Sequence, residues 1–67
     1  MNYAEKMEME GRLLGNIARW MESHGKVLAD RQRSNEYCGI RILEVLWRGA
    51  TFTVTEVDGL TCLIERQ

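Results

Sequence analysis

The sequence has no proline, one histidine and two cysteines, and each of these low counts narrows what the chain can be. Without proline, repeats or low-complexity stretches, nothing predicts a linker, so residues 1–67 are expected to form a single domain. No apolar run approaches the ~20 residues of a membrane span, and we expect no membrane contact. The N-terminal stretch carries glutamates where a signal peptide would be basic and then apolar. Free thiols in a reducing cytoplasm are therefore expected.

Residues that catalysis or metal binding would need are also scarce. His24 is the single histidine, and Cys38 and Cys62 lie far from it and from each other in the sequence. There is no CxxC, HxxxH or DxDxD spacing and no glycine-rich phosphate loop. The sequence therefore predicts a non-enzymatic protein with no catalytic residue, no cofactor and no metal ligand.

The formal net charge is only −1, which argues against a general polyanion binder. A local excess of positive charge nevertheless lies between residues 25 and 41, formed by Lys26, Arg31, Arg33 and Arg41. These four residues define an alternative function, a small nucleic-acid-binding module that contacts phosphates.

Residues 4–24 have the pattern of an amphipathic helix, with Gly25 as its stop. At 100° per residue, its apolar side chains fall within an arc of about 160°. The arc contains Met7, Leu13, Leu14, Ile17, Ala18, Trp20 and Met21. We expect this arc to pack on a sheet.

Two features of the helix have two interpretations each. Gly11 and Gly15 are spaced as GxxxG, which indicates either close approach of a second helix or two tolerated glycines at the helix margin. Glu10 lies near the centre of the apolar arc, where it either reaches water or pairs with an arginine such as Arg41.

The C-terminal half contains three β-prone runs, at residues 39–48, 51–57 and 60–66, joined by Arg48-Gly49 and Asp58-Gly59. Asp-Gly between apolar residues favours a two-residue hairpin turn. A short strand at 26–29 is also possible, and the polar residues 30–36 are expected in a loop. A helix over 35–48 competes with the first run. The expected fold class is α+β, in which one N-terminal amphipathic helix packs on a three- or four-stranded antiparallel β-meander.

The two turns set a register that sorts the strand residues onto two faces. The face expected under the helix carries Leu43, Val45, Trp47, Phe52, Val54 and Leu63, with Arg41 and Glu56 as an ion pair at one end. The other face is also apolar, and one helix cannot cover both. We therefore predict an interface for a second copy or another protein partner, formed by Ile40, Ile42, Leu46, Val57, Leu60 and Ile64. The predicted function is a small interaction or regulatory protein that forms a homodimer.

Overall fold

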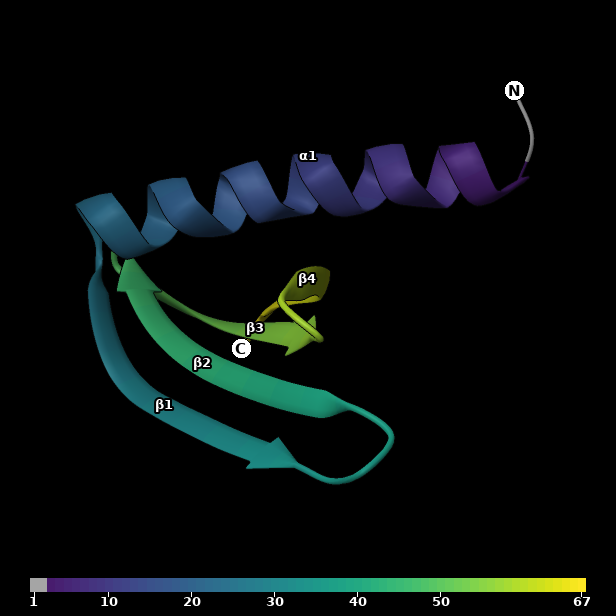
Figure 1. The fold of residues 1–67 in the computed structure, drawn as a ribbon. Coiled ribbons are helices and arrows are strands. Elements are labelled where there is room, and N and C mark those ends of the chain that lie inside the picture. The colour runs from purple at the N-terminus through teal and green to yellow at the C-terminus, as the bar shows by residue number, and fades with distance from the viewer. Residues whose placement is uncertain (1–2) are drawn as a thin grey trace.

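The computed structural model describes residues 3–67, with side chains from residue 12 onward. Helix α1 (Tyr3–His24) is followed by strands β1 (Lys26–Ser34), β2 (Gly39–Trp47), β3 (Ala50–Val57) and β4 (Leu60–Arg66). The strands form one antiparallel sheet in the order β1-β2-β3-β4, and α1 lies along one side of it (Figure 1). This arrangement confirms the predicted α+β fold class, and β2 occupies the residues for which a helix was the competing interpretation.

Both predicted hairpin turns are present. Arg48 and Gly49 have φ values of 51° and 75°, and Asp58 and Gly59 have values of 51° and 81°. Positive φ at both central residues defines the type I′ turn, whose twist matches that of the flanking strands. Arg48 tolerates this backbone while its guanidinium lies 4.6 Å from the Trp47 ring centroid, a cation–π contact.

Strand β1 is longer than the predicted 26–29, and the predicted loop over 30–36 is wrong for residues 30–34. The strand lies at the edge of the sheet and almost all of its residues are exposed, so it lacks the alternation that identifies a half-buried strand. The chain turns only after Ser34. There the Asn35 Oδ1 accepts hydrogen bonds from the backbone N–H groups of Tyr37 and Cys38 at 2.8 and 2.9 Å.

A bulge in β4 shifts the predicted register by one residue. Glu56 pairs with Thr61 and Thr55 pairs with Leu63, so Cys62 is the additional residue between them. Beyond the bulge the two faces are exchanged relative to the prediction. Ile64 therefore pairs with Val54 on the helix side, and its predicted place on the face away from the helix is wrong. Leu63, predicted in the core, lies on the opposite face and is exposed.

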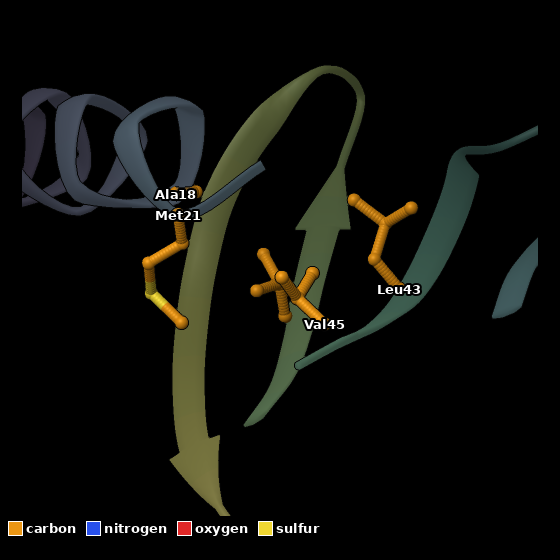
Figure 2. Packing of buried hydrophobic residues seen from close by; sticks show 5 residues of the cluster. Ala18, Met21, Leu43 and Val45 are labelled. Atoms are coloured by element: carbon orange, nitrogen blue, oxygen red, sulfur yellow. The ribbon is translucent and has the colours of Figure 1, made fainter. Parts of the chain in front are cut away.

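The core lies between α1 and the face predicted to be under it. Its buried residues are Ala18, Met21, Leu43, Val45 and Val54, with Trp47, Phe52 and Ile64 partly buried against them. Met21 extends from the helix toward the sheet in which β2 carries Leu43 and Val45 (Figure 2). Each large side chain that is fully buried contributes roughly 1.5–3 kcal/mol relative to exposure, and this core is small.

Only one edge of the predicted apolar arc faces the sheet. Ala18 and Met21 are buried, whereas Leu13, Ile17 and Trp20 are each at least half exposed. The helix approaches β4 on its small-residue side, because a Cβ on Gly15 would lie 3.8 Å from the Oγ1 of buried Thr61. Gly15 thus faces β4. Met7, Glu10 and Gly11 precede residue 12, where the described side chains begin. The predictions about them therefore lie outside the described residues.

Candidate functional site

The side of the sheet opposite α1, here called the open face, is not covered by any element of residues 3–67 (Figure 1). Its large apolar side chains come from three strands. Ile40, Ile42 and Leu46 belong to β2, Val57 to β3, and Leu60 and Leu63 to β4. Val57 is half-buried, and each of the others is between 38 and 47% exposed. Their role in an interface stays a prediction, and the structure replaces Ile64 with Leu63 in the set.

The register makes these side chains neighbours. Ile40 pairs with Val57, which pairs with Leu60, and the next row contains Ile42 and Leu63 on either side of Thr55. Directly opposed side chains in antiparallel strands have Cβ atoms about 4.5–5.5 Å apart, so the two rows form one continuous patch. Contiguous exposed apolar surface on a small protein marks a site of interaction more often than a scattered single residue does.

The basic residues of the alternative function are divided between the two faces. Lys26, Arg31 and Arg33 lie along β1 on the open face. Arg41 lies on the helix side, where it donates to the two carboxylate oxygens of Asp30 at 3.0 and 2.7 Å. Its other terminal nitrogen is 3.8 Å from a Glu56 oxygen, so the predicted Arg41–Glu56 pair is confirmed. The nucleic-acid alternative is therefore left with three basic residues, because the charge of Arg41 is already neutralised.

The Asp30–Arg41 ion pair predicts a specific loss of stability in acid. The hydrogen bond from Arg41 lowers the pKa of Asp30 below its ordinary value of 3.8. A carboxylate with a depressed folded pKa adds stability above the unfolded pKa, and this stability is lost as the pH falls through the folded value. We expect Asp30→Asn to melt at a lower temperature than the unaltered chain at pH 7 and at the same temperature at pH 2, by circular dichroism.

The control for this experiment is Glu36→Gln, which removes an exposed carboxylate in the β1–β2 loop. It is expected to leave the melting temperature unchanged at both pH values. If Asp30→Asn showed an equal deficit at pH 7 and pH 2, the charge of Asp30 would not contribute to stability.

Of the described residues, His24 and the two cysteines are the remaining candidates for chemistry. The His24 ring stacks on Trp20 with centroids 3.8 Å apart, and its Nδ1 donates to the Trp20 carbonyl oxygen at 3.0 Å. Cys38 and Cys62 are free cysteines. Across the side chains that the structure describes, no three His, Cys, Asp or Glu residues lie close enough together to hold a metal ion. The Cys62 thiol donates to the Leu60 carbonyl oxygen at 3.4 Å, so His24 and Cys62 each have a local partner.

A second exposed apolar surface lies on α1 and was missed from the sequence. Leu13, Ile17 and Trp20 have the spacing i, i+4, i+7, so they form one stripe along the helix. The signal was the width of the predicted arc, about 160°, which exceeds what contact with one sheet covers. The small residues Gly15 and Ala18 show which edge of the arc can approach the sheet most closely.

No protein-family model, curated protein or solved structure matches the chain. In the described part of the chain, α1 does not have the length and apolar character to cross a membrane. The candidate site is an apolar surface bordered by charged residues.

Proposed function

We propose that this protein is a small cytoplasmic interaction protein that forms a homodimer through its open face. The observation that carries the proposal is the continuous apolar patch of Ile40, Ile42, Val57, Leu60 and Leu63 on a face that α1 does not cover. Among the described side chains, no three His, Cys, Asp or Glu residues are gathered as a metal site would need, whereas the apolar groups are gathered. Binding is the activity that this distribution favours.

The size of the chain supports self-association. A single core in a domain below about 70–80 residues rarely contributes more than ~3–5 kcal/mol, so burial of a second face adds stability that the monomer lacks. Four strands spaced about 4.8 Å apart, with four rows of side chains about 6.7 Å apart, outline a face of roughly 500 Å² in projection. Two such faces would bury about 1,000 Å², the lower end of the range for specific interfaces. A dimer of micromolar affinity is expected.

Absolute mass in solution tests the proposal. We expect light scattering on a sizing column to show a dimer whose population rises with protein concentration. Ile42→Glu is expected to give a monomer with unchanged helical circular dichroism, because it places a carboxylate in the centre of the patch. The matched control is Tyr37→Glu, which changes an 85% exposed side chain in the β1–β2 loop and is expected to leave the dimer intact.

Two outcomes would contradict the proposal. One is an unaltered chain that remains monomeric up to millimolar concentration. The other is an Ile42→Glu variant that retains the dimer mass, which would place the contact elsewhere on the molecule. The exposed stripe of Leu13, Ile17 and Trp20 would then be the surface to alter next.

A further inference from the structure

Charged residues border the open face unevenly. The register arranges four rows across the sheet from β1 to β4. The first two are Arg33-Ile40-Val57-Leu60 and Arg31-Ile42-Thr55-Leu63, and the third is Ala29-Glu44-Thr53-Glu65. The fourth contains Lys26, Leu46 and Thr51. The β1 edge of the face is thus basic, and the β4 edge ends in the carboxylate of Glu65.

This asymmetry discriminates between the two ways in which open faces can pair with two-fold symmetry. If the axis runs across the strands, β1 of one copy lies over β1 of the other and the order of the rows is reversed. Arg33 then lies over Lys26 of the second copy, and the carboxylates of Glu44 and Glu65 lie over the apolar Ile42 and Leu63. If the axis runs along the strands, β1 of one copy lies over β4 of the other. Juxtaposed like charges oppose association, so the second arrangement is favoured.

The arrangement with the axis along the strands places each row over the same row of the second copy. Arg33 and Arg31 would lie over Leu60 and Leu63 of the second copy, where their aliphatic stems cover apolar surface. Glu65 of the second copy would lie over Ala29. The small side chain of Ala29 leaves space there. Lys26 and Arg31 flank it on β1 and Glu44 adjoins it on β2, so two cations meet two carboxylates at each of the two positions.

Edge-to-edge pairing through β1 is disfavoured by the same residues. A two-fold axis normal to the sheet pairs open-face residues with open-face residues, because side chains alternate along each strand. In the registers that pair the middle of one β1 strand with the middle of the other, Arg31 lies opposite Arg31 or Arg33, or Asp30 lies opposite Asp30. Charged residues on an exposed edge are a known protection against such pairing, and the bulge at Cys62 disrupts the β4 edge in a similar way.

We propose that two copies of the chain pair face to face about an axis parallel to the strands, with Glu65 of each copy between Lys26 and Arg31 of the other. This inference rests on the proposed function and adds the orientation of the two-fold axis of the dimer. Within one chain Arg31 and Glu65 lie on opposite edge strands, three strand spacings or about 14 Å apart, so they do not form a pair there. Any coupling between them is therefore a coupling between subunits.

Charge reversal tests this geometry. Arg31→Glu places two carboxylates against each other at both symmetry-related positions, and Glu65→Arg does the same with two guanidinium groups. We expect each variant to raise the dimer dissociation constant about tenfold or more. The double variant Arg31→Glu/Glu65→Arg restores opposite charges across the interface and is expected to return to within about threefold of the unaltered chain. Sedimentation equilibrium measures all four constants.

A mixture of the two single variants gives an independent readout. Both contacts in a heterodimer of Arg31→Glu with Glu65→Arg join opposite charges, so native mass spectrometry is expected to show the heterodimer in excess over both homodimers. The control is Arg48→Glu, which reverses a charge in the β2–β3 turn and is expected to leave the dissociation constant unchanged.

The outcomes separate this inference from the proposed function. A monomeric unaltered chain contradicts both. A dimer that Ile42→Glu disrupts, but whose dissociation constant is the same in the charge-reversed variants, retains the open face and overturns the axis. Single variants that weaken the dimer without rescue in the double variant or the mixture also overturn it, because the proposed contact requires reciprocal rescue.

Discussion

Gly25→Ala is expected to destabilise the protein by about 2–3 kcal/mol, the range in which overpacking of a rigid site falls. Gly25 is the single residue between α1 and β1, and its N–H donates to the Met21 carbonyl oxygen at 2.8 Å. A Cβ at this position would overlap the carbonyl oxygen of Leu46 and lie 2.8 Å from that of Met21. Both obstacles are backbone atoms, so α1 and β2 would have to separate.

Against a total of ~3–5 kcal/mol, this loss removes at least about 40% of the stability of the monomer. At about 4–8 °C per kcal/mol for a domain of this size, the melting temperature should fall by roughly 10–20 °C. Thermal unfolding by circular dichroism at one fixed protein concentration measures the shift. A change of less than about 3 °C would show that the helix–strand junction can relax around a methyl group.

Gly15→Ala is the matched control, because it makes the same chemical change in the middle of α1. There a Cβ would meet only the Thr61 Oγ1, at the ordinary contact distance of 3.8 Å. Replacement of glycine by alanine in a helix interior gains about 0.5–1 kcal/mol. The two variants are thus expected to shift the melting temperature in opposite directions. The difference between them isolates the close approach at Gly25 from the general effect of a methyl group.

The turns were predictable because short dipeptides determine them. Asp58-Gly59 and Arg48-Gly49 supply the residues next to strands at which a type I′ turn needs positive φ. With the turns placed, the β2–β3 register and the faces of both strands followed directly, including the Arg41–Glu56 pair. The position of the core was therefore predictable along β2 and β3.

The register of β4 was not predictable, because both of its faces carry apolar residues. Leu63 and Ile64 are adjacent and equally suited to burial, so a slip of one residue changes which of them is in the core without leaving a signature in the pattern. The bulge at Cys62 brings Ile64 beside Val54. This misplaced one residue of the candidate site. The site remains apolar because Leu63 lies on the open face instead of Ile64.

The length of β1 and the rotation of α1 depend on tertiary contacts that local sequence does not encode. The polar residues of β1 are extended because β2 offers them a hydrogen-bonding edge. The rotation of α1 follows from the small residues Gly15 and Ala18, which allow the helix to approach β4 closely. A pattern of apolar positions is dominated by large side chains, whereas the close approach of α1 to the sheet depends on small ones.

The second large expected effect comes from a pair of leucine truncations on opposite faces of the sheet. Leu43 is fully buried beneath α1, and Leu63 is nearly half exposed on the open face. Leu43→Ala is expected to cost about 2–5 kcal/mol, through lost burial and the cavity that remains. Because this approaches the whole stability of a small domain, the monomer should be largely unfolded at 25 °C. Leu63→Ala makes the same chemical change without opening a cavity in the core.

If the open face forms the dimer, the two variants should differ in their dependence on concentration. Assembly that requires the folded chain stabilises it by mass action, so Leu43→Ala should regain helical circular dichroism as its concentration rises. Leu63→Ala should remain folded when dilute but dissociate more readily, because it removes apolar area from the contact. The measurement is urea unfolding of each variant at several protein concentrations between 1 μM and 1 mM. This range includes a micromolar dissociation constant, which corresponds to a binding free energy of about −8 kcal/mol. A Leu43→Ala variant whose unfolding is independent of concentration would separate folding from assembly. The core beneath α1 would then have to stabilise the chain alone.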